Sequence, residues 1–581
     1  MMTRRSRLVQ VLLGSLACSA TVSFASPSGR VGPIDESKVR TGLSAQVARL
    51  VDEAGVLLRL DPVPLPRAWV VLRRRGERLA GGWYSGSDAR DALIRALVEL
   101  TAKNPKLESR VDAIEICLPH SQESALVRKG GAVLSNVHRG IKGIVLENGE
   151  AKVMVCPTAM VAGNRSFDNV EKRFRDEHHI SLSDYSDHTV ARTFDAYQFL
   201  LRLKPEPVII PMFRGNQLIA QSAVNRSTAR RLKDLMAKWL ISQVQPDGRM
   251  IYRYFPSRGE EAKGNNMIRQ FMATVALVRL GKETGDAGIA ELARKNLRYN
   301  LDHFYELNGE HGLIRYKDVR LGAVSLAALA IVEAPFRKEF ESYELALRKT
   351  TEYMLRGDGS FQTFYDNRDS TDNQNFYSGE TQLLWATLYE QTRDKAIIER
   401  IQRAFRYYRA WHLDEKNRNP AFIPWHTQAY VKLLLLEDHP EMREFVFEMN
   451  DWLLSMQQND GDYPDTYGRF YDPKRPKFGP PHASSTGVYL EGLIDAYRLA
   501  VEHKEQERMA RYRDAIMRGL RSLMQLQFAD DVDMFYVSKR ERVYGGMRTT
   551  EYDNGIRVDN VQHAFMGLQR IVKTFDGEGA W

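Results

Sequence analysis

DGSFQTF at residues 358–364, followed by YSGETQLLW at residues 377–385, is the clearest copy of a unit that recurs six times between Thr228 and Thr574. Each copy consists of an amphipathic helix, a loop rich in Gly, Asp or aromatic residues, and a second helix that opens on polar side chains. The other five loops read DGRMIY at 247–252, HGLIRY at 311–316, NPAFIPW at 419–425, DGDYP at 460–464 and DMFY at 533–536. Repeats of this size indicate stacked helical hairpins, and six hairpins are enough to close into a ring.

The helical period fixes where the two helices of each unit lie. The predicted outer helices span 229–243, 290–305, 343–355, 398–411, 443–457 and 511–527. The inner helices begin near Asn265, Gly322, Gly379, His426, Gly487 and Asp559. The inner set is more apolar, as in 321–332 and 382–388, which is expected of helices buried on both sides by the ring. No strand-rich segment interrupts the series. The sequence therefore predicts a mainly α chain in which residues 225–581 form an (α/α)6 toroid with a central cavity.

Residues 46–221 show a different, mixed pattern that predicts an α+β domain in front of the toroid. Strands are expected at 68–72 and 113–118, helices at 87–101 and 167–177, a hairpin at 143–155 with Asn148-Gly149 as its turn, and a strand or short helix at 193–203. No catalytic constellation is apparent in it. Packing, substrate presentation or partner binding are the roles that this leaves for the domain.

The order of elements in this domain resembles the AMMECR-like α+β fold. The resemblance is carried by the residues from Gly140 to Gly143, the hairpin, Pro157-Thr158-Ala159 and the helix that follows. The Leu-Arg-Gly-Cys-Ile-Gly run of that family has no counterpart in this chain. The resemblance therefore implies a fold and carries over no function.

Length and charge restrict the class of protein. With 581 residues, 43% hydrophobic and 27% charged, the chain is typical of a soluble protein of at least two domains. The formal net charge is +9, but no dense basic tract with interleaved aromatic residues is present, which argues against nucleic acid as a partner. A mild basic excess suits an anionic polymer such as a uronic-acid polysaccharide; an ordinary solvated surface is the alternative.

The first residues indicate export. Three arginines within residues 4–7 precede a mostly apolar stretch at 8–24, and Ser23-Phe24-Ala25 offers a cleavage site, so residues 1–25 are predicted to be a signal peptide. A linker is expected at 26–45. Small and polar residues within the apolar stretch disfavour a permanent membrane span. The mature protein is expected to be periplasmic or secreted; lipid attachment at Cys18 is the lesser alternative.

Two cysteines remain after removal of the signal peptide. Cys117 and Cys156 either pair in an oxidising compartment or stay as two buried thiols in strands. Two cysteines are too few for a Cys-rich zinc site. No metal or other cofactor is expected.

A closed ring of hairpins brings the openings of the inner helices to one end of the cavity, where their N-terminal dipoles favour acidic substrates. Aromatic rings there would stack on the apolar faces of sugars, and polar groups would bind the hydroxyls. The predicted substrate-binding residues are Tyr252, Tyr254, Asn266, Arg269, Tyr377, Trp425, Arg469, Tyr489 and Arg557. The predicted catalytic residues are Glu380, His426, Glu491, Asp559 and His563. His482 and Arg320 lie at the same openings and are assigned no role.

Two kinds of chemistry fit these residues. Glu380 and Glu491 open their helices in matching ways, and one raised and one ordinary carboxyl would serve as acid and base in glycoside cleavage. Histidines and tyrosines would instead abstract or return the C5 proton of a uronate, with an arginine neutralising its carboxylate. Each residue also has a structural reading: a glutamate near a helix start often caps it, a histidine often sits satisfied in the core, and an arginine often braces loops.

Residues 225–581 resemble the (α/α)6 toroid of six-hairpin glycosidase-like proteins, and within that group the C-terminal domain of D-glucuronyl C5-epimerases. The matching residues are YSGETQ at 377–382 with LYE at 388–390, and YLEGL at 489–493 with AY at 496–497. The resemblance implies an exported carbohydrate-active enzyme that acts on a polysaccharide or glycan by hydrolysis, β-elimination or C5 epimerisation. A non-catalytic glycan-binding or envelope polysaccharide assembly protein is the alternative.

Overall fold

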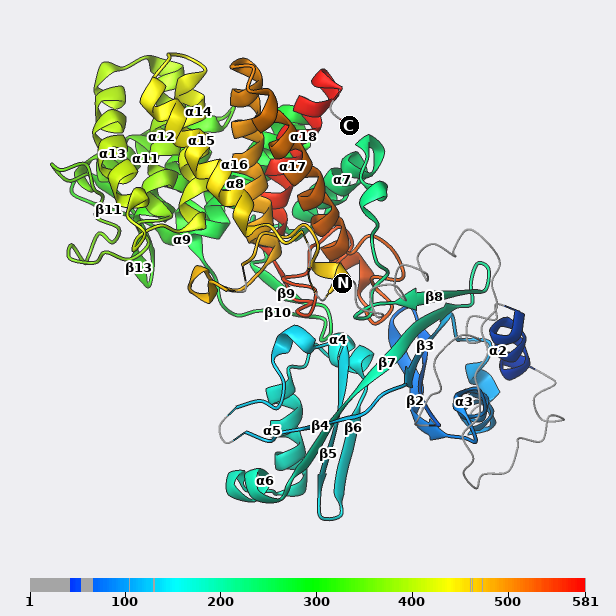
Figure 1. Ribbon diagram of the computed structural model, residues 1–581. Helices are drawn as coiled ribbons and strands as arrows, with labels where there is room; N and C mark the ends of the chain where they lie inside the picture. The colour runs from blue at the N-terminus through cyan, green and yellow to red at the C-terminus, as the bar shows by residue number, and fades with distance from the viewer. Residues whose placement is uncertain are drawn as a thin grey trace.

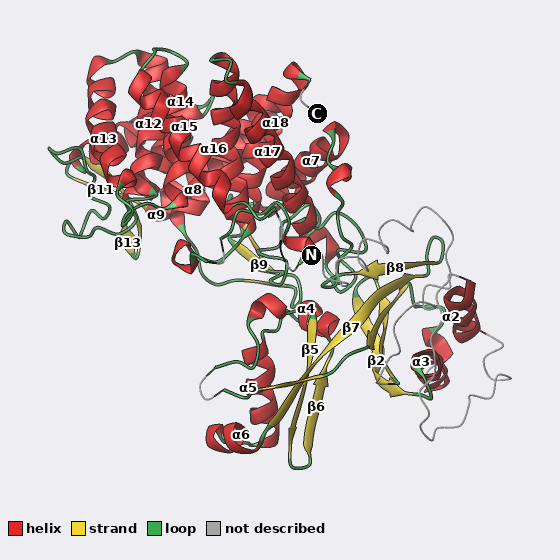
Figure 2. Ribbon diagram, in the orientation of Figure 1, coloured by secondary structure: helices red, strands yellow, loops and turns green. Residues whose placement is uncertain are grey.

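The computed structural model describes residues 42–53, 66–103, 105–128, 131–459, 463–472 and 474–579, together with Gly461 and Trp581. The predicted signal peptide and residues 26–41 of the predicted linker lie outside the described residues, as do Asp460 and Asp462. Helix α2 (Gly42–Glu53) begins a little before residue 46, where the sequence predicted the domain to start. Figure 1 shows a sheet-based part coloured blue to teal beside a helical part coloured green to red, and Figure 2 shows how sharply strands and helices segregate between them.

The N-terminal part is built on one antiparallel sheet. Its strands are β1 (Arg67–Arg74), β2 (Glu77–Ser85), β3 (Ala113–Pro119), β4 (Glu123–Ala125), β5 (Lys142–Asn148), β6 (Ala151–Val155), β7 (Val190–Arg202) and β8 (Val208–Met212). The strand order is β2-β1-β3-β7-β5-β6, and β4 and β8 also pair with β7. The long strand β7 pairs with β5 through its first half and with β3 through its second half, so it joins two halves of the sheet.

Helices cover each half of this sheet. They are α3 (Ala89–Lys103), α4 (Pro157–Ala162), α5 (Phe167–His178) and α6 (Leu182–His188). One apolar core lies between α2, α3 and strands β1 and β3, and a second lies between α5 and strands β5 and β6. Cys117 of β3 and Cys156, just before α4, form a disulfide, which resolves the alternative that the sequence left open. The predicted strands, helices and hairpin are confirmed, and 193–203 belongs to a strand.

The C-terminal part consists of six helical hairpins. The outer helices are α7 (Arg226–Gln243), α9 (Ala287–Phe304), α11 (Glu341–Tyr353), α13 (Lys395–Leu413), α15 (Pro440–Leu453) and α17 (Gln506–Leu526). The inner helices are α8 (Met267–Thr284), α10 (Leu321–Glu333), α12 (Tyr377–Thr392), α14 (Ile423–Leu434), α16 (Ala483–Glu502) and α18 (Val558–Glu578). Each inner helix contacts the next one, and α18 contacts α8, which closes the ring. The predicted (α/α)6 toroid is therefore confirmed.

Local sequence explains these helices. Asn225 and Asn266 cap α7 and α8 with their side chains, and Asp286 and Asp394 cap α9 and α13, so backbone N–H groups at these helix starts are satisfied. Outer helices bury one face, whereas every residue of α10 from Leu321 to Val332 is buried. An inner helix packs against two inner neighbours and an outer helix at once, which is why its sequence is apolar all round.

The loops of the ring contain short strands that the sequence did not predict. They are β9 (Arg253–Phe255), β10 (Glu260–Glu261), β11 (Tyr305–Asn308), β12 (His311–Tyr316), β13 (Asp318–Val319) and β14 (Ile556–Arg557). Strand β9 pairs with β14, so the loop before α8 is joined to the loop before α18. Short 3-10 turns lie in the connections: η3 (Pro105–Leu107), η4 (Asn136–His138), η5 (Gln221–Ala223), η6 (Arg337–Phe340), η7 (Pro420–Phe422), η8 (Leu454–Met456), η9 (Pro464–Thr466), η10 (Pro476–Phe478) and η11 (Arg540–Arg542).

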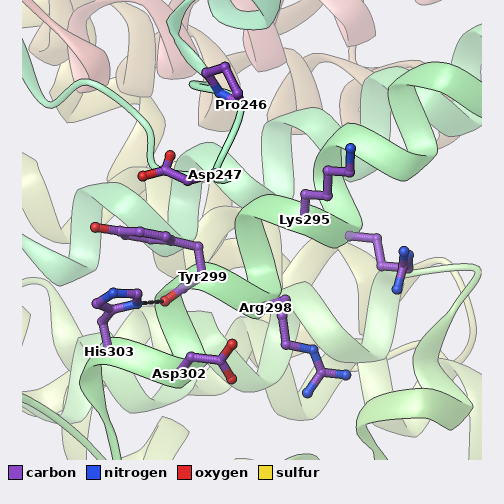
Figure 3. Close-up of a pocket in the computed structure, with 8 residues that line it drawn as sticks. Pro246, Asp247, Lys295, Arg298, Tyr299, Asp302 and His303 are labelled. Carbon is purple, nitrogen blue, oxygen red and sulfur yellow. Dashed lines mark hydrogen bonds between the residues drawn. The ribbon is translucent and has the colours of Figure 1, made fainter.

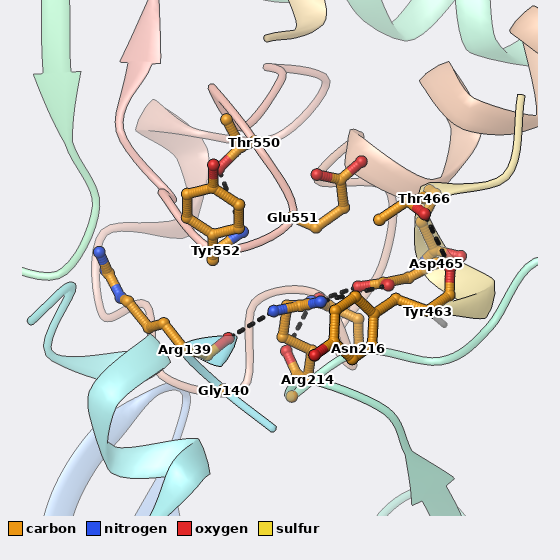
Figure 4. A network of polar contacts seen from close by, with 12 residues as sticks. Arg139, Gly140, Arg214, Asn216, Tyr463, Asp465, Thr466, Thr550, Glu551 and Tyr552 are labelled. Atoms are coloured by element: carbon orange, nitrogen blue, oxygen red, sulfur yellow. Dashed lines mark hydrogen bonds and ion pairs between the residues drawn. The ribbon is translucent and has the colours of Figure 1, made fainter. Parts of the chain in front are cut away.

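The N-terminal domain rests on the loops that lead into α16 and α18. Arg214 is fully buried there; its Nε donates to Asp465 Oδ2 at 2.6 Å and its Nη1 donates to the carbonyls of Val137 and Arg139 (Figure 4). Asn164 Nδ2 donates to Asp553 Oδ1 at 3.0 Å. The domain therefore contacts the same end of the ring at which the inner helices begin. None of the described helices is both long and apolar enough to span a membrane.

Candidate functional site

Three charged side chains meet where α8 and α18 begin. Arg269 Nε lies 3.0 Å from Asp559 Oδ2, and Arg557 Nη2 lies 2.7 Å from the same oxygen. The Arg269 side chain is 31% exposed and that of Asp559 is 5% exposed. We call Arg269, Arg557 and Asp559 the arginine cluster. The structure thus brings together three predicted site residues, of which Arg269 lies near the start of the ring domain's sequence and the other two lie near its end.

The electrostatics of this cluster follow from its contacts. Burial by itself would raise the pKa of Asp559, but the Arg269 and Arg557 guanidiniums outweigh it and hold that pKa at about 2. Asp559 is therefore ionised at neutral pH. Because two guanidiniums share one carboxylate, the cluster keeps a net positive charge on the partly exposed side of Arg269. Such a site favours an anionic group on a ligand.

Two further side chains border the arginine cluster. Arg269 Nη1 donates to Tyr252 Oη at 2.5 Å, so the tyrosine from the first loop is held beside the guanidinium. His482, at the start of α16, contacts Ser485 Oγ through Nδ1 at 2.7 Å. Burial, reinforced by Arg557, lowers the pKa of His482 to about 4, so its imidazole is neutral near pH 7. The sequence placed His482 at a helix opening but gave no signal that it would lie near these charges.

Glu380 is a buried carboxyl in the first turn of α12. Its side chain is 2% exposed, and Oε2 has no hydrogen-bond partner among the described residues. A Cβ at Gly322 of the neighbouring α10 would lie 2.1 Å from that oxygen, so only glycine leaves room for it. Burial raises the pKa of Glu380 to about 8, which keeps it protonated at neutral pH. Tyr377 lies in the same turn, and burial together with Glu380 raises its pKa.

A second contact joins α16 to α18, one helical turn along α18 from the arginine cluster. His563 Nδ1 lies 2.7 Å from Glu491 Oε2, and the edge of Trp425 packs against the imidazole at a ring-centre distance of 5.7 Å. The prediction that Glu491 opens its helix as Glu380 does is wrong, because α16 already begins at Ala483. Glu491 is fully buried, and its Oε1 has no partner within the described part of the chain. His563 follows Asp559 by four residues, so both lie on one face of α18. The His563–Glu491 pair therefore lies one helical turn below the arginine cluster.

His426 has a different environment from His563. It is fully buried, its ring stacks on Phe422 at 3.5 Å, and its Nδ1 lies 2.9 Å from the Phe422 carbonyl oxygen. Burial lowers its pKa to about 3. These contacts match the structural reading of a satisfied core histidine, and they leave its catalytic role without support.

Four predicted binding residues make structural contacts of their own. Arg469 Nη1 donates to Glu551 Oε2 at 2.5 Å, a contact that braces two loops. Asn266 Oδ1 accepts from the backbone N–H of Arg269 and so caps α8. Tyr254 is buried in β9, where Arg542 covers its ring. Tyr489 is buried against Phe470, with ring centres 5.6 Å apart.

Two pockets of the ring domain differ in their relation to the predicted site residues. One of about 160 Å³ lies between the openings of α8 and α10 and is lined by Asn265, Asn266, Tyr316 and Arg320, so Asn266 borders a cavity as well as capping its helix. Another of about 460 Å³ lies on the outer helix α9, where Lys295, Arg298, Tyr299, Asp302 and His303 surround it (Figure 3). None of the predicted site residues lines this pocket on α9.

No family model matches the chain, and no curated protein sequence matches it. Solved structures match it in part. A D-mannose isomerase shares 10% identity at a TM-score of 0.48, with 60% of this chain and 98% of that chain covered. The GH76A α-1,6-mannanase of Salegentibacter sp. HEL1_6 shares 11% identity at a TM-score of 0.45, with 59% and 98% covered. An unsaturated glucuronyl hydrolase of Streptococcus agalactiae shares 11% identity at a TM-score of 0.42, with 62% and 94% covered.

Likenesses of this size carry no argument about the reaction of this chain. The fold class rests on the closed ring of inner helices described above. The resemblances to AMMECR-like domains and to C5-epimerases stay predictions.

Proposed function

We propose that this protein is an exported carbohydrate-active enzyme that acts on an acidic polysaccharide or glycan at the end of the ring where the inner helices begin. The observation that carries the proposal is the arginine cluster, in which Arg269 and Arg557 share the one carboxylate of Asp559. A uronate carboxylate is planar and matches the fork of a guanidinium. The Cys117–Cys156 disulfide supports the export part of the proposal, because such bonds persist in oxidising compartments.

The groups around the cluster support proton transfer at C5 of a uronate. The carboxylate carbon of a uronate is bonded directly to C5, so an arginine that neutralises the carboxylate also acidifies the C5 hydrogen. His563 lies one turn from Asp559 and is oriented by Glu491, which makes it the proposed base. Glu380, protonated near neutral pH, is the proposed acid.

The reaction balances in either of two outcomes. In β-elimination, His563 takes the C5 proton, the electron pair forms the C4–C5 double bond, and the oxygen that leaves C4 takes the proton of Glu380. In epimerisation, the C5 proton is removed from one face and a proton is returned to the other face, with no bond broken in the chain. Both outcomes use the same arginine cluster to hold the carboxylate.

Incubation of the mature protein with acidic and neutral polysaccharides in D₂O tests the proposal. We expect acidic polymers alone to react, and NMR to show either an unsaturated uronate or deuterium at C5 without cleavage. His563→Gln should slow turnover by about 100-fold or more, as expected for loss of a general base. His503→Gln, at an exposed histidine after α16, is the matched control and should leave the rate unchanged. New reducing ends on neutral polymers would contradict the proposal.

A non-catalytic glycan-binding protein is the second candidate function. One observation favours it: Glu380 and Glu491 are 2% and 0% exposed, so neither carboxyl is open to a ligand in this conformation. Under this alternative, acidic glycans raise the melting temperature while no substrate changes in the NMR spectra. His563→Gln would then alter affinity at most.

A further inference from the structure

A large pocket lies on the outside of the ring, along the outer helix α7. Its volume is about 880 Å³, and it is lined by residues of α7 on one side and by Tyr544 and Trp581 on the other. Arg231, Asp234 and Lys238 line it from one face of the helix, because residues three, four and seven positions apart lie on the same side, and Arg230 lies next to Arg231. Figure 1 shows α7 beside the C-terminal end of the chain, and none of the three residues of the arginine cluster lines the pocket. This outer pocket is therefore separate from the arginine cluster.

The outer pocket carries positive charge that its own ion pairs do not cancel. Arg226 Nε lies 2.6 Å from Asp576 Oδ1, and Arg230 pairs with the same aspartate. Among the described residues, Arg231 donates only to a backbone carbonyl, that of Ala529, at 3.1 Å. Lys238 is exposed and has no hydrogen-bond or ion-pair partner within the described residues. Asp234 is the single acidic residue among those that line the pocket, so a net positive charge remains.

Two aromatic side chains complete the wall opposite α7. Trp581 is fixed by its Nε1, which donates to Asp576 Oδ1 at 3.0 Å, and by Phe575, whose ring centre is 5.4 Å away. Tyr544 is 38% exposed. A rigid indole and a partly exposed phenol provide flat apolar surfaces, while the basic side chains provide partners for anionic groups. Sugar rings that carry carboxylates present both features at once.

We propose that the outer pocket is a second, non-catalytic binding site for an acidic oligosaccharide chain. The choice of an acidic glycan as ligand rests on the proposed function. Tyr544 belongs to the loop before α18, the same loop that carries Arg557 into the arginine cluster. A polymer held in the outer pocket therefore stays beside this loop, which raises its effective concentration near the proposed active site.

Titration of the full mature protein with oligogalacturonate tests this inference, with maltodextrin as the neutral control. We expect two binding events for oligogalacturonate, both weakened by salt, and none for maltodextrin. The double variant Arg231→Ser/Lys238→Ser should weaken one event by at least tenfold and leave the melting temperature unchanged, since both side chains are exposed. Tyr544→Ser should weaken the same event. Lys172→Ser/Arg173→Ser, at two exposed charges on α5, is the matched control and should change neither event.

The outcomes separate this inference from the proposed function. Arg269→Gln removes a guanidinium of the arginine cluster and should abolish only the other event. If Arg269→Gln binds as the wild type does while the outer-pocket variants lose binding, the result supports the outer pocket as a binding site and contradicts the proposed active site. Unchanged affinity and stoichiometry in Arg231→Ser/Lys238→Ser would overturn the outer pocket. Binding of vesicles of anionic phospholipid, with no binding of oligogalacturonate, would overturn it as well.

Discussion

Two halves of the ring each place a glutamate and a histidine on neighbouring inner helices, yet the two pairs differ in physical character. Where α12 meets α14, Glu380 Oε2 has no hydrogen-bond partner among the described residues, and His426 stacks on Phe422 in the core. Where α16 meets α18, Glu491 and His563 form a 2.7 Å contact one turn below the arginine cluster. A glutamate or histidine on an inner helix therefore does not define a site by itself, because the neighbouring side chains determine what it can do.

The difference arises from how closely neighbouring helices approach. At Gly379 of α12, a Cβ would lie 2.5 Å from Trp425 Cβ and 2.9 Å from His426 Nδ1, so this half is packed tightly around apolar rings. At the other half, the side chains of Arg269 and Arg557 are 31% and 16% exposed and lie between ring and solvent. We therefore interpret the α12–α14 half as a scaffold that supplies a buried acid, and the α16–α18–α8 half as the ligand-binding side.

The largest expected effect is a loss of stability when the arginine cluster is altered. Asp559→Asn leaves two guanidiniums without their shared carboxylate, and we expect the free energy of unfolding at pH 7 to fall by about 3–5 kcal/mol. Because the folded pKa of Asp559 is about 2 and its ordinary value is 3.8, the stabilisation is present above about pH 4 and is lost as the pH falls through 2. Denaturant unfolding at several pH values measures both. Asp531→Asn, at an exposed surface pair, is the control and should cost less than about 1 kcal/mol.

Glu380 offers a test of the buried half without any substrate. The folded protein keeps the Glu380 proton up to about pH 8, whereas the unfolded chain releases it near pH 4.5. The free energy of unfolding of the wild type should therefore fall by a few kcal/mol between these pH values. Glu380→Gln cannot ionise and should gain stability relative to the wild type over the same range. Glu390→Gln, near the far end of α12, is the control; parallel profiles for wild type and Glu380→Gln would mean that Glu380 is ionised and cannot be the acid.

The two histidines sharpen the comparison further. His426→Ala removes a stacked, hydrogen-bonded ring from the core and should cost about 2–3 kcal/mol of stability. His563→Ala takes the ring away from the fully buried Glu491 and leaves Glu491 Oε2 without its partner, so it should also cost about 2–3 kcal/mol. Urea unfolding of both variants gives the answer. Ligand binding separates the two halves: His563→Ala should also lose affinity for an acidic oligosaccharide, and a loss of affinity in His426→Ala alone would break the distinction between scaffold and ligand-binding side.

The smallest expected effect concerns the border of the arginine cluster. Tyr252→Phe removes the hydroxyl that accepts from Arg269 and keeps the ring, so stability should change by about 1 kcal/mol or less. Affinity for an acidic oligosaccharide should fall, because Arg269 loses the contact that orients it. Titration calorimetry measures this affinity for the wild type and for the variant. An affinity gain would show that the hydroxyl competes with the ligand for the guanidinium.

The sequence predicted the ring well because its signal is local and repeated. Helix α7 was expected at 229–243 and spans Arg226–Gln243, and the inner helices begin close to their expected residues. Strand β2 was missed because Gly81 and Gly82 interrupt it and its burial does not alternate. The pairing of β9 with β14 joins residues about three hundred positions apart, and no local pattern encodes such a contact.

The site was harder to predict than the fold. Asp559, Arg269 and Arg557 were recognised because they lie at helix openings, which is a periodic property. The burial of His426 against Phe422 and the loop-bracing role of Arg469 depend on neighbouring segments that periodicity does not place. The space at Gly322 that receives the Glu380 carboxyl is likewise a tertiary feature. Residue type and helical position identify candidate site residues, and the packing around each residue determines which of them can contact a ligand.

A crystal structure of the mature protein with bound oligogalacturonate tests the central claim most directly. We expect a uronate carboxylate within hydrogen-bond distance of the guanidinium of Arg269 or Arg557, with C5 of that sugar facing His563. A chain bound at another face of the ring, with the arginine cluster empty, would contradict it.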